Sequence, residues 1–148
     1  MIDNLQIYHV NVNCTDFERS LAFYKMIGFR EHMDLGEGGV DGLGFGDCNM
    51  RAMLLSLGDD PRATVLDLIE WTDPKTDGAP YAHLAHTGIG RICVRVKDLG
   101  AVYDELVGKG VEFLSEPVEA NLGGGHQKFV CLKDPDGTIL EFMEFIKD

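Results

Sequence analysis

The chain contains two copies of one sequence pattern, and this duplication limits the possible folds more strongly than any other feature. Each copy begins with alternating apolar residues, passes through an aspartate and continues with a helical pattern. The two copies of this opening pattern occupy residues 5–27 and 87–109. The interval from His9 to Asp16 equals the interval from Arg91 to Asp98. The pattern therefore predicts a duplicated unit that begins with a strand and a helix.

The two copies also end in the same way. Residues 66–71 and 140–145 each read apolar, acidic, apolar, apolar, glutamate and aromatic. Matching beginnings and endings in the same order predict two βαβββ modules within one domain. The expected boundaries are about 5–71 for module 1, 72–88 for the linker, about 89–146 for module 2, and 1–148 for the single domain.

Strand and helix patterns follow one another within each module in the expected order. Strands are expected near residues 5–13, 29–35, 50–57, 63–71, 89–97, 111–114, 127–133 and 138–146, and helices near 16–27 and 98–109. Residues 36–46 are rich in glycine, with room for a short extra strand, and residues 115–126 are expected to form a loop.

The helix ends carry recognisable signals. Thr15 and Glu18 match a capping box at the start of the first helix. Gly28 is expected to end that helix. Asp98 is a good N-cap residue for the second helix.

The charge and composition exclude several classes of partner. Acidic residues outnumber basic residues by 25 to 13, and the formal net charge is −12. This field repels nucleic acid and anionic membrane surfaces. No segment approaches the ~20 consecutive apolar residues of a membrane-spanning helix, and the first residues have no pattern of a secretory signal. The four cysteines form no CxxC pair, which is typical of reduced thiols. We therefore expect a cytoplasmic protein with a small-molecule ligand.

The first strand of each module has one apolar and one polar face, because alternate side chains point to opposite sides. The polar faces carry His9, Asn11 and Asn13 in module 1, and Arg91, Cys93 and Arg95 in module 2. Asp67 and Glu141 occupy matching positions on the last strands. If the two modules pack about a pseudo-twofold axis, these carboxylates should converge with His9 and Arg91 in one cleft. Asn11, Arg91, Cys93 and His126, which follows three glycines, are then expected to bind the ligand.

Two other interpretations of the polar faces remain open. Both faces can simply be solvated, as one face of many antiparallel sheets is. Arg91 can also form a structural ion pair with Glu141 or Asp67, whatever the function of the protein.

Three segments carry a family resemblance: residues 8–12 ahead of Asp16, residues 21–29, and residues 134–141. In these segments the sequence resembles the vicinal oxygen chelate superfamily, which includes glyoxalase I, extradiol dioxygenases and bleomycin-resistance proteins. The resemblance implies an α+β fold of two βαβββ modules related by a pseudo-twofold, with curled mixed sheets that enclose a cavity. It also implies a homodimer. It does not imply one activity, because a shared fold hosts many functions.

In metal-using members of this superfamily, the first and last strand of each module carry the metal ligands. The resemblance places His9, Asp67, Arg91 and Glu141 at these positions. Arg91 departs from the pattern, because arginine does not lose its proton in a protein and cannot bind a cation. His9, Asp67 and Glu141 thus remain as ligands for one divalent ion, which would be Zn, Ni, Co, Mn or Fe. A site without metal is the alternative.

The resemblance implies two classes of function. The first is a glyoxalase-like isomerase, lyase or epimerase that acts on a small, oxygen-rich substrate, with Glu141, His9 and Arg91 as catalytic residues. Glu141 would move a proton beside a metal, or His9 would act as general base while Arg91 binds an anionic oxygen. The second is a non-catalytic protein that binds a drug or antibiotic, as bleomycin-resistance proteins do.

Overall fold

The structure is a computed structural model that describes residues 2–3 and 5–146. The chain divides into two compact units, Met1–Gly78 and Ala79–Asp148, which we call unit 1 and unit 2. The boundary between them lies inside the segment predicted as a linker. Each unit contains one helix and one four-stranded mixed sheet, in the order strand, helix and three strands. The predicted α+β fold of two βαβββ modules is therefore confirmed, and each sheet is open rather than closed into a barrel.

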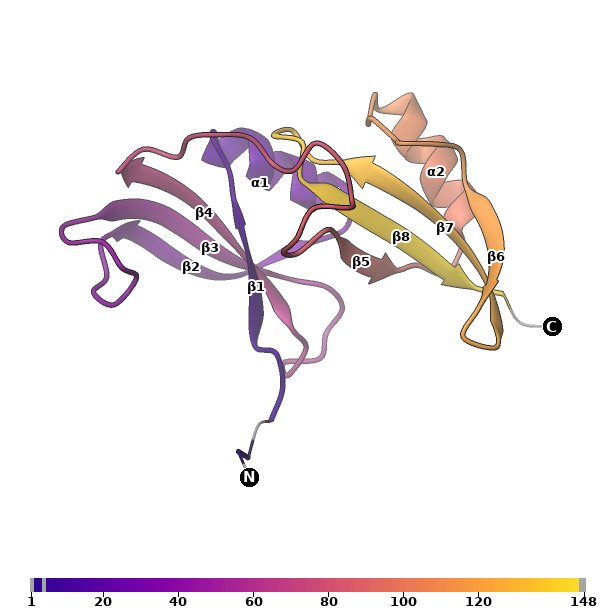
Figure 1. Ribbon diagram of the computed structural model, residues 1–148, viewed down its shortest axis with the longest axis horizontal. Helices are drawn as coiled ribbons and strands as arrows, with labels where there is room; N and C mark the ends of the chain where they lie inside the picture. The colour runs from indigo at the N-terminus through magenta and orange to yellow at the C-terminus, as the bar shows by residue number, and fades with distance from the viewer. Residues whose placement is uncertain (1, 4, 147–148) are drawn as a thin grey trace. The chain divides into compact units, whose positions relative to one another are not determined.

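Unit 1 begins with its edge strand and ends with the strand beside it (Figure 1). Its elements are β1 (His9–Asn13), α1 (Phe17–Met26), β2 (Arg30–Gly38), β3 (Asn49–Ser56) and β4 (Val65–Asp73). The strand order is β1-β4-β3-β2, in which β1 runs parallel to β4 and the other neighbours are antiparallel. The parallel pairing of β1 with β4 therefore brings the first and last strands of the module together.

Unit 2 repeats this arrangement. Its elements are β5 (Ile92–Arg95), α2 (Leu99–Gly108), β6 (Val118–Leu122), β7 (Gly125–Lys133) and β8 (Ile139–Phe145). The order is β5-β8-β7-β6, and β5 runs parallel to β8. The strand order and the direction of pairing are the same as in unit 1, which confirms the duplication that the sequence predicts.

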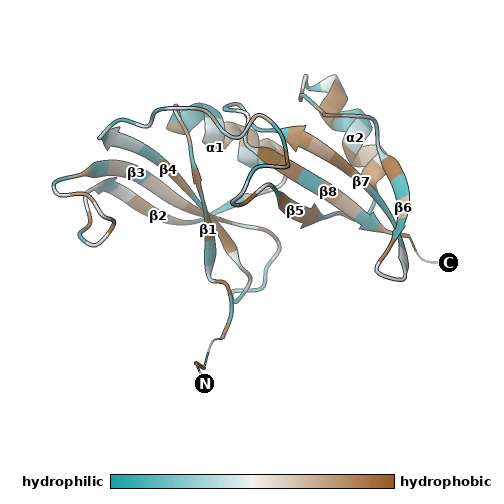
Figure 2. Ribbon diagram, in the orientation of Figure 1, coloured by the Kyte–Doolittle hydropathy of each residue, from teal (hydrophilic) through white to brown (hydrophobic). Residues whose placement is uncertain are grey.

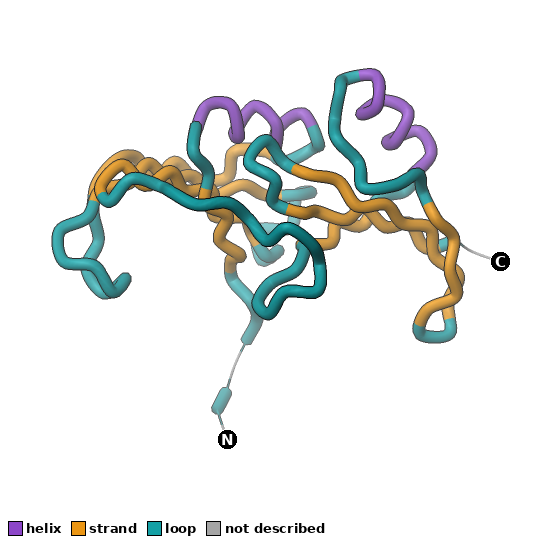
Figure 3. The backbone as a smooth tube through the Cα atoms, turned by 45° about the horizontal axis from the view of Figure 1, so that its top comes forward, coloured by secondary structure: helices purple, strands orange, loops and turns teal. Residues whose placement is uncertain are grey.

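Each helix covers one face of the sheet in its own unit (Figure 3). Hydrophobic and hydrophilic residues alternate along the strands (Figure 2). On the helix side of the sheet in unit 1, Val12, Leu66 and Leu68 are buried. Burial of such side chains contributes about 1.5–3 kcal/mol each. The opposite face of β1 and β4 carries His9 and Asp67 together with Ile69 and Trp71, which belong to a second hydrophobic cluster. Among the described residues, neither helix has the length and apolar character needed to cross a membrane.

An aspartate caps the N-terminus of each helix. The Asp16 carboxylate accepts a hydrogen bond from the Arg19 N–H at 3.0 Å, and Asp98 accepts one from the Ala101 N–H at 2.9 Å. The prediction for Asp98 is confirmed, but the predicted capping box of Thr15 and Glu18 is wrong. The helix begins at Phe17, so Asp16 rather than Thr15 has the extended backbone of an N-cap residue.

A glutamate from the last strand provides a second cap in each unit. Glu70 Oε2 accepts a hydrogen bond from the Phe17 N–H, and Glu144 Oε2 accepts one from the Leu99 N–H, both at 2.8 Å. These N–H groups belong to the first residue of each helix, where no partner exists within the helix. The contacts explain why both copies of the terminal pattern carry a glutamate at this position.

A glycine with positive φ follows the last turn of each helix. The φ angle of Gly28 is +107°, and that of Gly110 is +79°. The Phe29 N–H donates to the Tyr24 carbonyl, and the Val111 N–H donates to the Leu106 carbonyl, at 2.9 and 3.0 Å. This pattern is the Schellman motif, in which a left-handed residue is almost always glycine. The predicted end of the first helix at Gly28 is confirmed.

The predicted strand at 111–114 is wrong, and β6 lies inside the segment predicted as a loop. Residues 111–114 form only an isolated bridge between Phe113 and Leu132. Pro117 has no N–H to donate and separates this bridge from β6. Residues 118–122 alternate apolar and polar side chains, a strand signal that the sequence analysis did not use.

Other boundaries also differ from the prediction, and the strand predicted at 89–97 is shorter, at Ile92–Arg95. The first strand begins at His9 rather than at residue 5, because its partner β4 begins at Val65, which pairs with His9. The glycine-rich segment 36–46 contains the end of β2 but no strand of its own.

We predict that Asp16→Ala lowers the free energy of unfolding by about 1 kcal/mol, because the Arg19 N–H loses its acceptor. Glu18→Ala should cost less than about half of that, since Glu18 lies in the first turn and acts through the helix dipole. Urea denaturation followed by circular dichroism measures both values. A larger loss of unfolding free energy in Glu18→Ala than in Asp16→Ala would support the capping box of Thr15 and Glu18 instead.

Candidate functional site

The first site pair in unit 1 consists of His9 and Asp67. Parallel pairing of β1 with β4 places Asn11 beside Asp67, and His9 lies two residues earlier on the same face. His9 Nε2 lies 4.0 Å from Asp67 Oδ2, which is too long for a hydrogen bond. The imidazole is half exposed, at 47%, whereas the carboxylate is only 11% exposed. An accessible proton acceptor therefore lies next to a buried acid.

The Asp67 carboxylate is only partly satisfied. Its Oδ1 atom is buried and has no hydrogen-bond partner. The Asn11 amide donates to the Asp67 backbone carbonyl at 3.0 Å, and therefore does not stabilise the carboxylate. Burial raises the pKa of Asp67, and the nearby His9 lowers it to a smaller extent. Burial of an unpaired carboxylate costs free energy, and groups of this kind are concentrated at functional sites.

The second site pair, in unit 2, consists of Arg91 and Glu141. Parallel pairing of β5 with β8 places Cys93 beside Glu141, and Arg91 lies two residues earlier, as His9 does in unit 1. Arg91 Nε donates to Glu141 Oε2 at 2.6 Å. Glu141 is 3% exposed, and Arg91 is 45% exposed. The hydrogen bond to Glu141 raises the pKa of Arg91. The interpretation of Arg91 as the partner of Glu141 in an ion pair is therefore confirmed.

Two thiols flank Glu141 on the neighbouring strands. Cys93 on β5 and Cys131 on β7 are both paired with it in register. Cys131 Sγ donates to Glu141 Oε2 at 3.8 Å. Burial, followed by the hydrogen bond and negative charge of Glu141, raises the pKa of Cys93 to about 12. Burial also raises the pKa of Cys131. A raised pKa favours the neutral thiol over the nucleophilic thiolate.

His126 lies on β7, at the hairpin that joins β6 to β7. Its Nε2 atom lies 3.2 Å from Glu119 Oε2. The structure therefore pairs His126 with a residue of the same hairpin, where Asn121 lies opposite it in register.

Sequence reasoning missed an aromatic pair in unit 1. The rings of Phe45 and Trp71 lie 5.1 Å apart between centroids. Trp71 Nε1 donates to Asn13 Oδ1 at 3.1 Å, on the same face of β1 and β4 that carries His9 and Asp67. Trp71 lies four residues after Asp67, so both side chains lie on the same face of β4. This alternation could have identified Trp71 from the sequence. Phe45 lies in a loop, where the sequence has no periodicity to place it.

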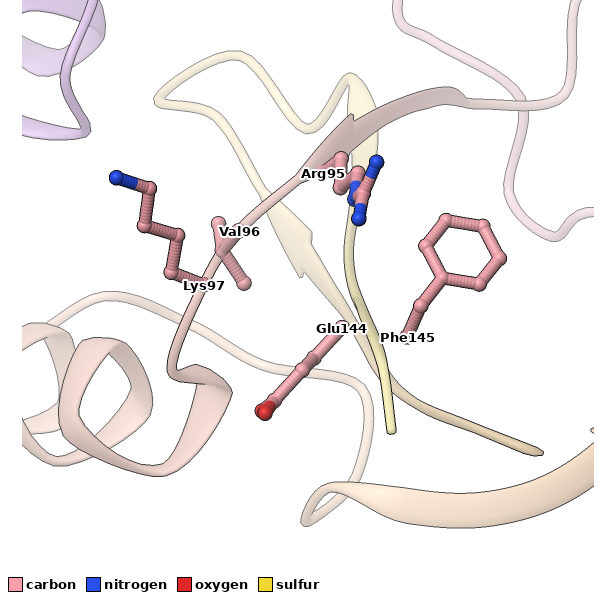
Figure 4. A pocket seen from close by; sticks show the side chains of 5 residues that line it. All are labelled: Arg95, Val96, Lys97, Glu144 and Phe145. Atoms are coloured by element: carbon pink, nitrogen blue, oxygen red, sulfur yellow. The ribbon is translucent and has the colours of Figure 1, made fainter. Parts of the chain in front are cut away.

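A pocket of about 670 Å³ lies at the ends of β5 and β8 in unit 2 (Figure 4). Its lining residues are Arg95, Val96, Lys97, Glu144 and Phe145. The Arg95 guanidinium lies 4.9 Å from the centre of the Phe145 ring, and Glu144 caps α2. In Figure 4, Lys97 points away from Arg95. Each polar side chain of this pocket therefore either has a contact of its own or points away from the others.

The residues of unit 2 do not fit the divalent metal that the family resemblance implies. Within either unit, the described residues contain no group of three His, Cys, Asp or Glu side chains that could hold a metal ion. Arg91 donates to the carboxylate that would be a ligand, and its positive charge repels a cation. His9 and Asp67 are suitable donor types, but they are only two.

Comparisons with known proteins agree with this fold. The sequence model of the Glyoxalase/Bleomycin resistance protein/Dioxygenase superfamily matches residues 6–142. A comparison with curated proteins gave no match. A glyoxalase family protein from Bacillus cereus has a TM-score of 0.80 at 16% identity, over 99% of this chain and 97% of that one.

Two further solved structures illustrate the functional range of this fold. Trypanothione-dependent glyoxalase I from Leishmania major has a TM-score of 0.65 at 19% identity, over 95% of this chain and 87% of that one. TnmS3, an antibiotic-binding protein from Streptomyces sp. CB03234, has a TM-score of 0.64 at 21% identity, over 99% of this chain and 100% of that one. At these identities the likeness establishes the fold and not the activity.

We predict that Asp67→Asn stabilises the protein near neutral pH. Because the pKa of Asp67 is raised in the folded state, its contribution to stability is present below the ordinary value of 3.8 and is lost as the pH rises through the folded value. The neutral amide of asparagine does not lose stability as the pH rises, so the stability that the variant gains over the wild-type protein should become smaller in acid. Urea denaturation of both proteins at neutral and mildly acidic pH measures it.

Asp34→Asn is the matched control for this prediction. The Gly36 N–H and the Arg51 side chain lower the pKa of Asp34, so the sign is reversed and the variant should lose stability near neutral pH. A loss of stability in Asp67→Asn at neutral pH would show that its carboxylate has a partner.

We predict slow alkylation of Cys93. A pKa of about 12 in place of 9.0 lowers the thiolate fraction near pH 8 by roughly three powers of ten. Glu141→Gln removes a negative charge and should accelerate iodoacetamide labelling of Cys93, as measured by peptide mass spectrometry. Cys48, which lies in unit 1, is the internal control, and its rate should not change. Equal acceleration at both cysteines would indicate general loosening of the fold.

Proposed function

Because the chain belongs to the Glyoxalase/Bleomycin resistance protein/Dioxygenase superfamily, we propose that it is a small-molecule enzyme of the isomerase, epimerase or lyase type in which His9 transfers a proton and Asp67 assists it. The observation that carries this proposal is the buried, partnerless Oδ1 atom of Asp67 beside a half-exposed imidazole. A stable fold gains nothing from this arrangement, whereas proton transfer requires an acid and a base whose environments differ.

In the proposed reaction, neutral His9 removes a proton from a carbon next to a carbonyl group of an oxygen-rich substrate. The C–H electron pair forms a C=C bond, the π electrons of the carbonyl group move to its oxygen, and an enolate results. The imidazolium that forms is 4.0 Å from the Asp67 carboxylate, whose negative charge stabilises it. The proton then returns to carbon or to oxygen, so the overall reaction needs no oxidant or reductant.

Arg91 is our candidate for binding an anionic oxygen. Its Nε–H is engaged by Glu141, but a guanidinium has four further N–H donors, and the side chain is 45% exposed. Such a fork of donors binds carboxylate and enolate oxygens well. Glu141 then acts by holding this fork in place, and Cys93 contributes a neutral thiol to the same face.

A second candidate function is non-catalytic binding of a flat, apolar ligand such as an antibiotic. The pair of Phe45 and Trp71 favours it, because Phe45 is exposed and aromatic rings stack on planar molecules. The antibiotic-binding TnmS3 supports it as a structural neighbour. We further propose a cytoplasmic homodimer, since family members commonly form dimers and the four cysteines form no CxxC pair.

Solvent exchange tests the proposed enzyme directly. The protein is incubated in D₂O with 2-hydroxycarbonyl compounds and with thiol adducts of 2-oxoaldehydes, and NMR follows the loss of the C–H signal next to the carbonyl. We expect the wild-type protein to catalyse this exchange with at least one compound. His9→Gln and Asp67→Asn should each slow it by about a hundredfold or more, the contribution of a general base.

His32→Gln is the matched control, because His32 is an exposed histidine on β2 of the same unit, and it should exchange at the wild-type rate. Equal rates in all four proteins would contradict the role of His9 and Asp67. Stoichiometric binding of a planar aromatic compound with no exchange of any substrate would favour the second candidate.

A further inference from the structure

Glu141 is a carboxylate that needs a cation. It lies in the middle of β8, between β5 and β7, and only 3% of its side chain is exposed. A buried carboxylate without a positive partner is strongly destabilising, and so the positive charge that faces Glu141 helps to stabilise the fold. In the superfamily, this position commonly faces a divalent metal ion.

Arg91 supplies that charge here. Its Nε atom lies 2.6 Å from Glu141 Oε2, the distance of a charge-assisted hydrogen bond. The guanidinium keeps its proton at every pH at which the protein is folded. A metal ion at Glu141 would have to displace this donor and would then lie beside a fixed positive charge.

We propose that Arg91 takes the place of a metal cation at Glu141, so that unit 2 of this chain has a permanent guanidinium where related proteins commonly bind a divalent ion. This inference rests on unit 2 alone and does not depend on the proton transfer proposed for His9 and Asp67. It implies that Glu141 does not bind metal while Arg91 is present. The residue at position 91 then decides whether Glu141 faces a guanidinium or a metal ion.

Arg91→His provides the test. It removes the guanidinium and introduces an imidazole two residues before the strand position that pairs with Glu141. Cobalt(II) alone is titrated into each protein, and calorimetry and visible absorption measure its binding. We expect Arg91→His to bind Co²⁺ at least about tenfold more tightly than the wild-type protein. Addition of Glu141→Gln to this variant should abolish the gain.

Arg95→His is the matched control. Arg95 lies on the same face of β5, but its guanidinium lies 4.9 Å from the centre of the Phe145 ring rather than on a carboxylate. This variant also gains an imidazole, and its Co²⁺ affinity should stay at the wild-type value. An equal gain in Arg95→His and Arg91→His would overturn the proposal, as would no gain in folded Arg91→His.

The wild-type protein and Glu141→Gln provide a second comparison that does not require Arg91→His to fold. If Arg91 replaces the metal, the two proteins should bind Co²⁺ equally. Wild-type binding that falls tenfold or more in Glu141→Gln would show that Glu141 is a metal ligand in the presence of Arg91, and would overturn the proposal. Neither comparison uses enzymatic activity, so its outcome is independent of the proposed reaction.

Discussion

Parallel pairing of the first strand with the last strand is the constraint on which each unit depends. It places Asn11 beside Asp67 and Cys93 beside Glu141, and it brings His9 and Arg91 to the same relative position two residues earlier. On the opposite face, the same pairing directs Glu70 and Glu144 toward the first N–H groups of the helices. One register therefore anchors the helix on one side of the sheet and positions the candidate site residues on the other.

The two units share this backbone geometry but carry different arrangements of charged side chains on it. In unit 2, Arg91 forms an ion pair with the buried Glu141, and the guanidinium keeps its charge. In unit 1, Asp67 lies beside an imidazole at 4.0 Å, and its Oδ1 atom has no partner. Evolution commonly retains such an unsatisfied group only where it serves a function. The duplicated unit thus has one charge pair joined by a hydrogen bond and one pair in which a carboxylate oxygen lacks a partner.

Sequence reasoning predicted the repeated architecture and the strand faces well, because both follow from periodicity. It also identified Asp98 and Gly28, whose residue types are specific to helix ends. It failed at Thr15, because two adjacent residues could each cap the helix and only the backbone decides between them. It failed at Phe45, since a loop has no period, and the distance between its ring and Trp71 depends on tertiary packing.

Residue type at an equivalent position, rather than the position itself, decides the chemistry of this fold. His9 and Arg91 occupy the same place in their units, yet an imidazole can exchange a proton near neutral pH and a guanidinium cannot. A family resemblance transfers positions, so it would assign both residues to one metal centre. The observed contact of Arg91 with Glu141 removes one carboxylate from that centre. Unit 2 consequently carries a charge pair at the position where unit 1 carries an imidazole beside a buried carboxylate.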